Sequence, residues 1–203
     1  MQYLEDLKIF AGNNKCYVIY VDSKRLSERA IYRRYVETEV VDIVNGKKIK
    51  KKIRKSSGPG SVTIIPMVSS NKVLLVRQYR PALRKPGNKK NNGWIYELPG
   101  GHTEEGESIY DAAKRELEEE LGYTAKKLKF LYNRHFTPWS SDALDNIFVA
   151  SGLEKGTKQL DDDELITTVT FSANEVARML KNGSIKDVST RDGLSYWLIF
   201  LKK

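Results

Sequence analysis

The chain has 203 residues, 40% of them hydrophobic and 30% charged, with a formal net charge of +9. This composition describes a soluble globular protein. No apolar run approaches the roughly 18 residues of a membrane-spanning helix, and the first residues lack the pattern of a secretory signal. Cys16 is the only cysteine, which excludes a disulfide within the chain and argues against a cysteine-based zinc site. We therefore expect a cytoplasmic protein that does not act at a membrane.

The first part of the chain predicts a small antiparallel sheet. Residues 16–21 and 30–44 are rich in β-branched and aromatic residues, as strands are. Asn45-Gly46 is a strong hairpin signal, and 47–55 would be the returning strand. We predict that residues 1–57 form this sheet and that 58–203 form the main domain. So small a sheet is marginal alone, so we expect it to rest on its own core or on a second subunit.

Two runs carry much of the positive charge. Residues 47–55 hold seven basic residues and residues 84–90 hold four. Such runs attract anionic substrates, and they occur both in nucleic-acid sites and in solvated loops. Neither run interleaves the aromatic residues that single-strand binding uses for stacking, so we favour solvated loops over a nucleic-acid partner.

The main domain alternates strands with helices. The hydrophobic patterns predict helices that start after the caps Ser108 and Ser172, and a third near the C-terminus. Strands are predicted at 61–68, 71–80, 94–101, 126–136, 146–151 and 166–171, and the helices at 109–121, 173–183 and 190–201. This order indicates an α/β fold in which helices cover a sheet.

The helix over 109–121 carries an unusual concentration of acids. Leu117 and Leu121 recur at four-residue spacing and predict a buried stripe. Glu116, Glu119 and Glu120 share another face, where like charges repel. A hard divalent cation would relieve this repulsion, because Mg²⁺ binds through a few carboxylates plus substrate phosphates. The alternative is a solvated acidic face, although no lysine interrupts 116–120.

The stretch from Gly101 to Tyr123 resembles the Nudix box. Gly101 is followed after five residues by Glu107, and after seven more by the run that starts at Arg115 and ends in Gly122-Tyr123. Every signature position is filled. The resemblance implies an α/β/α sandwich with a mixed sheet, preceded by the small N-terminal sheet. It also implies an enzyme that hydrolyses a nucleoside diphosphate linked to another moiety.

Residues outside the box resemble the ADP-ribose and nucleotide-sugar pyrophosphatase branch of this family. They are the RQYRP segment 77–81, the ELPGG segment 97–101 and Pro138. The branch implies a homodimer that exchanges N-terminal sheets. Gly100 stands where the branch commonly has alanine, a change we expect to be tolerated because the position supplies a backbone carbonyl. The loop 137–146 also departs from the branch.

The resemblance implies a role for each site residue. Glu116 and Glu120 would be the principal ligands of Mg²⁺, or of Mn²⁺, assisted by Glu119 and the Gly100 carbonyl. Arg115 would orient Glu119, and Glu107 would brace the box loop. The remaining roles are diphosphate binding by Arg77 and Arg80, base stacking or loop anchoring by Trp139, and general base catalysis by Glu164 or by one of Asp161 to Asp163.

We therefore predict Mg²⁺-dependent hydrolysis of ADP-ribose or a related nucleoside diphosphate sugar, with Glu164, Glu119 and Arg115 as the catalytic set. Two alternatives stay open. One is a Nudix enzyme that acts on RNA 5′ ends or nucleoside triphosphates, as the basic runs suggest. The other is a Nudix module that senses a nucleotide without catalysis.

Overall fold

The computed structural model describes residues 10–11, 14–17, 35–44, 47–56, 60–83, 93–139, 141–159 and 165–202. The chain divides into two compact units, Met1–Gly60 with His135–Leu144, and Ser61–Arg134 with Asp145–Lys203. The predicted domains 1–57 and 58–203 stay a prediction, since a compact unit need not fold independently.

The first unit contains an antiparallel sheet of four strands in the order β1 (Phe10–Ala11), β2 (Asn14–Tyr17), β3 (Tyr35–Val44) and β4 (Lys47–Ser56). The hairpin predicted around Asn45-Gly46 is present, because β3 and β4 pair from Val44 with Lys47 to Tyr35 with Ser56. The predicted strand at 16–21 appears only as the end of β2, and 18–21 lie outside the described residues, as do 30–34.

The second unit contains a mixed sheet whose central order is β11-β6-β5-β10-β9. β10 runs parallel to β5, whereas β6 is antiparallel to both β5 and β11. The bounds are β5 Ser61–Ser69, β6 Lys72–Tyr79, β7 Trp94–Glu97, β8 Gly100–His102, β9 Tyr123–His135, β10 Leu144–Lys155 and β11 Ile166–Ser172.

The single strand predicted at 94–101 is in fact two. β7 pairs with β6, and β8 pairs with β5, with Leu98 and Pro99 between them. Proline has no N–H to donate to a ladder and marks the ends and edges of strands. The chain therefore changes its pairing partner at Pro99, which brings Gly100 beside Thr63.

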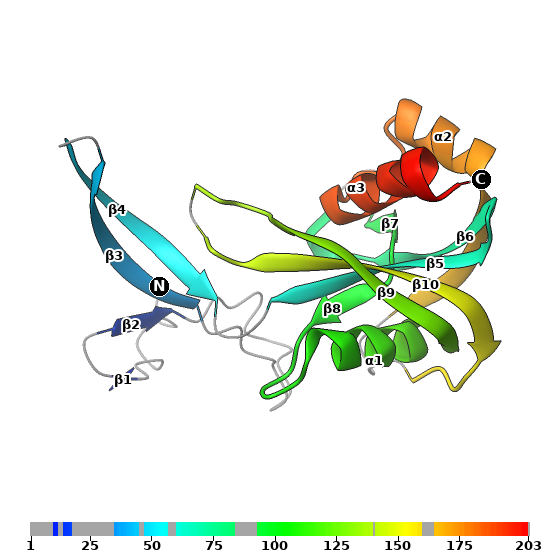
Figure 1. The fold of residues 1–203 in the computed structure, drawn as a ribbon, viewed down its shortest axis with the longest axis horizontal. Coiled ribbons are helices and arrows are strands. Elements are labelled where there is room, and N and C mark those ends of the chain that lie inside the picture. Colours follow the sequence, from blue (N-terminus) through cyan, green and yellow to red (C-terminus); the bar gives the residue numbers. More distant parts are fainter. Residues whose placement is uncertain are drawn as a thin grey trace. The chain divides into compact units, whose positions relative to one another are not determined.

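Three helices cover the two faces of this sheet, with α1 on one and α2 and α3 on the other (Figure 1). They are α1 Ile109–Leu121, α2 Ala173–Lys181 and α3 Val188–Tyr196, and η1 is a short 3₁₀ turn at Pro81–Leu83. Ser172 caps α2 in a full capping box with Glu175. The predicted third helix is present, and its last turn, η2 (Trp197–Leu201), is wound as a π-helix.

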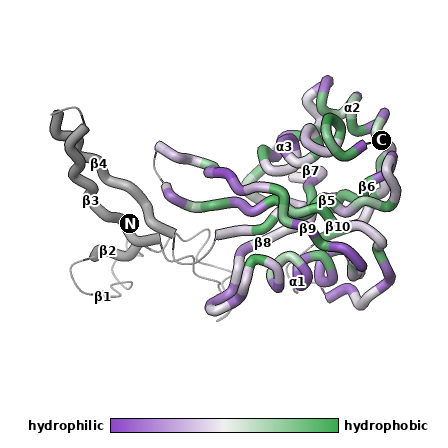
Figure 2. Tube along the Cα trace, viewed as in Figure 1, coloured by the Kyte–Doolittle hydropathy of each residue, from purple (hydrophilic) through white to green (hydrophobic). Residues whose placement is uncertain are grey.

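Each layer of helices has its own hydrophobic core. Ala113, Leu117 and Leu121 of α1 pack on one face of the sheet, whereas Val176, Leu194 and Trp197 pack on the other. Figure 2 shows hydrophobic residues concentrated in the central strands and hydrophilic ones on the outer side of α1. The predicted α/β sandwich is thus confirmed. Among the described helices none is long and apolar enough to cross a membrane.

Candidate active site

The acidic helix α1 is fixed in place by its two ends and its buried side. Ser108 accepts a hydrogen bond from the Asp111 backbone N–H at 3.1 Å. Gly122 ends the helix in the left-handed conformation, with φ of 72°, where glycine carries no steric penalty. Leu117 is 1% exposed and Leu121 4%. Burial of these leucines fixes the rotation of α1 about its own axis, and this rotation determines the direction in which its glutamates point.

Arg115 is the centre of the polar network on this helix. Its guanidinium donates to both carboxylate oxygens of Glu107 at 2.9 and 3.0 Å. It also donates to Glu116 at 2.8 Å, to Glu119 at 2.9 Å and to the His102 carbonyl at 3.0 Å. The predicted contacts of Arg115 with Glu119 and Glu107 are therefore present, and the contact with Glu116 is an additional one.

This network shifts the ionisation of its members. The hydrogen bonds from Arg115 hold the pKa of Glu107 below its usual range. Hydrogen bonding to Glu107 in turn raises the pKa of Arg115. Arg115 thus stays charged and supplies a fixed cation among the glutamates, which offsets the repulsion expected from their spacing.

Strand β8 lies against the glutamate face of α1. The Gly100 N–H donates to Glu120 at 3.1 Å, and a side chain at Gly101 would overlap the carboxylate of Glu116. Glu116 and Glu120 are only 9% and 5% exposed, whereas the side chain of Glu119 is 38% exposed. The structure therefore brings Glu116 and Glu120 together with the Gly100 backbone, and leaves Glu119 nearer to solvent.

Gly100 itself has no space for a side chain. A Cβ there would overlap the Val62 carbonyl oxygen, because β8 lies close to β5. The packing of this chain therefore requires glycine at position 100 in place of the more common alanine. From the sequence we expect only that glycine is tolerated there.

The donor set formed by Glu116, Glu120 and the Gly100 carbonyl fits a hard divalent cation. Two buried carboxylates and a backbone carbonyl offer the oxygen ligands that Mg²⁺ prefers, with further positions left for water and phosphate. Among the described residues no group of three or more His, Cys, Asp or Glu side chains converges at ligand distance. The reason is visible in the contacts, since Arg115 holds Glu119 and the Gly100 N–H holds Glu120.

The two arginines proposed for the diphosphate have separate partners. Arg80 donates to Glu97 through Nε at 3.0 Å and Nη2 at 2.9 Å. Arg77 lies over the ring of Trp94, 4.5 Å from its centroid. Arg77 and Arg80 are three positions apart, which places them on opposite faces of an extended chain. Arg80 lies on the α1 side with Val76, and Arg77 lies on the other side.

Glu97 is a residue that the sequence reasoning did not single out. It is 8% exposed, and burial raises its pKa although Arg80 opposes the shift. Glu97 precedes Gly100 by three residues. In the sequence it is the first residue of the ELPGG segment, which indicated the branch of the family but no role for Glu97 itself.

Asp145 was also missed. It is fully buried, accepts hydrogen bonds from Ser61, Thr63 and Ser189, and forms an ion pair with Arg134. These partners join β5, β9, β10 and α3. Because Thr63 pairs with Gly100, this cluster supports β5, the strand against which β8 lies. No local sequence pattern predicts such a long-range cluster.

Two predicted site residues stay predictions. Trp139 is 63% exposed and belongs to the first compact unit. Glu164 lies outside the described residues, as do Asp161 to Asp163. The next residue, Leu165, is described, and its carbonyl accepts a hydrogen bond from the Tyr79 N–H at the end of β6.

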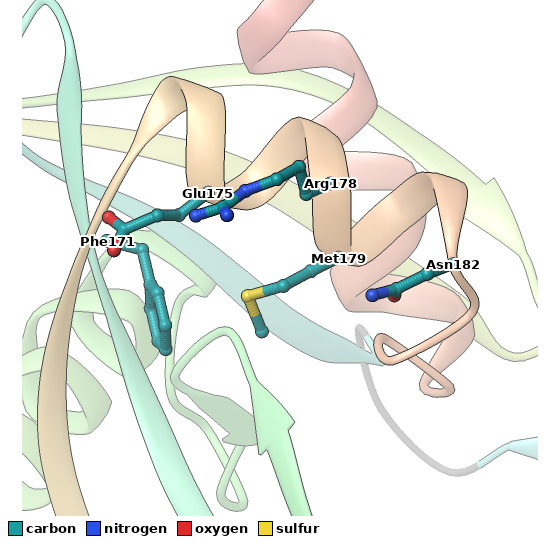
Figure 3. A pocket seen from close by; sticks show the side chains of 5 residues that line it. All are labelled: Phe171, Glu175, Arg178, Met179 and Asn182. Atoms are coloured by element: carbon teal, nitrogen blue, oxygen red, sulfur yellow. The ribbon is translucent and has the colours of Figure 1, made fainter.

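A shallow hollow lies elsewhere, along α2. It is lined by Phe171, Glu175, Arg178, Met179 and Asn182, and encloses about 250 Å³. Figure 3 shows Glu175 reaching back toward the end of β11 at Phe171, where it completes the cap of α2. The volume is below the roughly 300–1,000 Å³ of ligand pockets, so we assign no ligand to it.

Comparison with known proteins decides the family. Residues 59–191 match the model of the NUDIX domain. The chain belongs to the Nudix family. It is a Nudix hydrolase of the type that includes ADP-ribose pyrophosphatases, and the resemblance noted from the box is confirmed.

Several relatives match most of the chain. The "Methanol dehydrogenase activator" of Bacillus methanolicus is 32% identical over 84% of this chain and 89% of its own length. The "ADP-ribose pyrophosphatase" of Bacillus subtilis (strain 168) is 31% identical over 80% and 82%. The solved structure "Crystal structure of ADP compounds hydrolase" has a TM-score of 0.62 at 24% identity, covering 89% of this chain and 91% of its own. This last likeness supports the Nudix fold.

Proposed function

We propose that this Nudix hydrolase cleaves the pyrophosphate bond of ADP-ribose or a related nucleoside diphosphate sugar, releasing a nucleoside monophosphate and a sugar phosphate. The observation that carries the proposal is the network in which Arg115 and β8 hold Glu116 and Glu120 beside the Gly100 backbone. The relative named ADP-ribose pyrophosphatase supports this choice of substrate.

Glu116, Glu120 and the Gly100 carbonyl, with Glu119 at the solvent side, would hold Mg²⁺ or Mn²⁺. Such an ion supplies charge neutralisation on phosphate oxygens and lowers the pKa of a bound water. Arg115 would align Glu116 and Glu119 before any ion binds, because its guanidinium donates a charged hydrogen bond to each.

The other residues bind the substrate and move the proton. Arg80, held by Glu97, contacts the diphosphate, and Arg77 contributes positive charge from the other face of β6. Glu164 takes the proton of the attacking water as the water oxygen bonds to phosphorus and the bridging P–O bond breaks. Trp139 stacks on the base. We propose that the enzyme works as a cytoplasmic homodimer.

A hydrolysis panel tests the substrate. Initial rates with Mg²⁺ and Mn²⁺ on ADP-ribose, ADP-glucose, GDP-mannose, UDP-glucose and dinucleoside polyphosphates should be highest for a nucleotide sugar. Faster turnover of a nucleoside triphosphate or of an RNA 5′ end would instead support the alternative Nudix activity. No metal-dependent turnover of any diphosphate would support a sensing module.

Glu120→Gln tests the metal site. We expect its kcat on the best substrate to fall by about 100-fold or more, because even groups that only support a ligand contribute 10–100-fold. The matched control is Glu154→Gln, whose side chain is 57% exposed on β10 and should leave the rate unchanged. Wild-type turnover by Glu120→Gln under saturating Mg²⁺ would show that the metal assignment is wrong.

A second candidate function is activation of another enzyme, which the similarity to a "Methanol dehydrogenase activator" favours. The test is the rate of purified methanol dehydrogenase with and without the protein. An increase with the wild type but not with Glu120→Gln would connect activation to the hydrolytic site, whereas no increase would remove this candidate.

A further inference from the structure

The amide oxygen of Gln78 is buried and has no hydrogen-bond partner. Gln78 is 4% exposed, and among the described side chains only two buried polar atoms are unpartnered, its Oε1 and Trp197 Nε1. Buried acceptors in native proteins are almost always satisfied, and an exception calls for an explanation such as a functional role. An unpaired acceptor also lowers stability, so its presence at this position indicates a role other than stabilising the fold.

Gln78 faces the side of the sheet that carries α1 and the candidate active site. On β6 it pairs with Ile95 of β7 and with Ile166 of β11. Leu74 and Val76, the preceding residues of the same parity, pack in the core beneath α1, so Gln78 faces the α1 side as well. It is the last strand residue on this face before Arg80, which pairs with Glu97.

The neighbouring strand β11 begins opposite Gln78. The residue opposite Gln78 on β11 is Ile166, two positions after Glu164. The N–H of Tyr79 donates to the Leu165 carbonyl at 3.2 Å. Gln78 is therefore next to the start of β11, and it lies between β11 and β7, the strand that precedes Gly100 in the chain.

The other unpartnered atom lies in a different environment. Trp197 is fully buried in the core between the sheet and α2 and α3, among residues such as Ile65, Val176 and Leu194. Its Nε1 sits on an otherwise apolar ring, and no charged site residue belongs to that cluster. Gln78, in contrast, shares its sheet face with an arginine and a glutamate.

We propose that Gln78 is a further residue of the active site, whose amide oxygen accepts a hydrogen bond from an O–H donor present only in the working complex. The donor is either a water of the hydrated divalent cation or a hydroxyl of the nucleotide sugar. This inference rests on the proposed function. It gives Gln78, the second residue of the RQYRP segment, a role that is separate from those of Arg77 and Arg80.

The test uses Gln78→Met, which removes the acceptor while keeping a long unbranched side chain. An apolar side chain in place of an unpaired polar group is neutral or stabilising, so the Tm of the protein without metal or substrate should stay equal or rise by a few degrees. kcat/KM on the best nucleotide sugar should fall about 10- to 100-fold, as for a lost hydrogen bond to a charged or polarised group.

Two further variants make the result decisive. Gln78→Glu keeps an acceptor oxygen but buries a charge, so it should be less stable than Gln78→Met and yet more active. Leu74→Met, on the same face of β6 and 4% exposed, controls for a methionine in this strand and should leave kcat/KM unchanged, because swaps between leucine and methionine are well tolerated.

The kinetic parameters distinguish the two donors. If a cation-bound water is the donor, Gln78→Met raises the Mg²⁺ concentration needed for half-maximal rate. If a substrate hydroxyl is the donor, it raises KM for the nucleotide sugar at saturating Mg²⁺. A lower Tm or a failure to fold would show a structural hydrogen bond and overturn the inference, as would unchanged kcat/KM. An inactive wild type would instead refute the proposed function.

Discussion

At the scale of single residues, Arg115 makes a set of contacts that no other type of side chain could reproduce at this position. Its planar guanidinium donates to three glutamates and a backbone carbonyl, a geometry that the single ammonium of lysine cannot reproduce. The arginine is therefore a permanent counter-ion for the acidic helix face. Its role was accessible from the sequence only in part, because i,i+4 spacing indicates Glu119 and the resemblance to the box indicates Glu107, but neither indicates Glu116 or the His102 carbonyl.

Glu107 should make stability depend on pH. Its pKa is lowered in the folded state by Arg115, so it stabilises the fold above its unfolded pKa and loses this contribution as pH falls through its folded pKa. Glu107→Gln should therefore cost about 1–3 kcal/mol near pH 7. The difference in unfolding free energy from the wild type should shrink below about pH 4.

Denaturant unfolding at several pH values measures this difference. Glu105→Gln is the control, since Glu105 is exposed in the same loop and should show no such trend. A Glu107→Gln cost that is equal at pH 7 and pH 3 would contradict the ionic role of the pair.

Gly101 should be essential for the orientation of the Glu116 side chain. A methyl group there would overlap the end of the Glu116 side chain, which can move aside at little cost to the fold. We expect Gly101→Ala to keep its Tm within a few degrees but to require more Mg²⁺ and to lose about 10- to 100-fold in kcat.

Rates measured across a Mg²⁺ titration check this expectation. Gly106→Ala is the comparison, because nothing lies within 4 Å of a Cβ at Gly106. Its positive φ of 78° should cost stability but leave the Mg²⁺ dependence unchanged. Equal Mg²⁺ dependence in both variants would exclude steering of Glu116 by Gly101.

At the scale of elements, local chemistry predicted the helices well and the strands less well. Ser108, Ser172 and Gly122 mark helix ends by backbone hydrogen bonding within a few residues, and such signals are readable in one sequence. The split of 94–101 into β7 and β8 depends instead on which strand lies beside each half. Pairing partners are long-range information, and Pro99 was the local hint.

The cap of α2 should affect stability alone. Ser172 and Glu175 exchange both hydrogen bonds of a capping box, and α2 packs on the face opposite α1 (Figure 1). Ser172→Ala should lower the free energy of unfolding by about 1 kcal/mol and leave kcat/KM unchanged. Denaturant unfolding and a rate assay give the two values, and a marked loss of activity would show that α2 communicates with the site.

At the scale of the whole molecule, the sandwich and the box were predictable because a complete motif and alternating elements specify them together. The site was predictable for the residues that the motif contains. The roles assigned to Glu97, Asp145 and Gln78 were not predictable, because they depend on burial and on partners up to 84 positions away. Burial of a polar residue follows from the fold and cannot be read from its immediate neighbours.

The homodimer is a prediction for the complete chain. The N-terminal sheet is charged along β4, where Arg54 and Lys52 are opposite Glu37 and Glu39 of β3. A sheet of this kind is marginal unless other surfaces support it. Light scattering coupled to gel filtration should give about twice the 23.2 kDa of one chain, at both low and high salt. A monomer at micromolar concentration would refute the exchange of N-terminal sheets.

The close approach of β8 to β5 has a consequence for how this sequence can change over time. A methyl group at position 100 would meet backbone atoms of Val62 and Thr63. A smaller side chain at either of these positions would therefore not make room for it, and only a shift of β5 itself would. An alanine grafted from a relative should thus fail unless the backbone path of β5 were transferred with it.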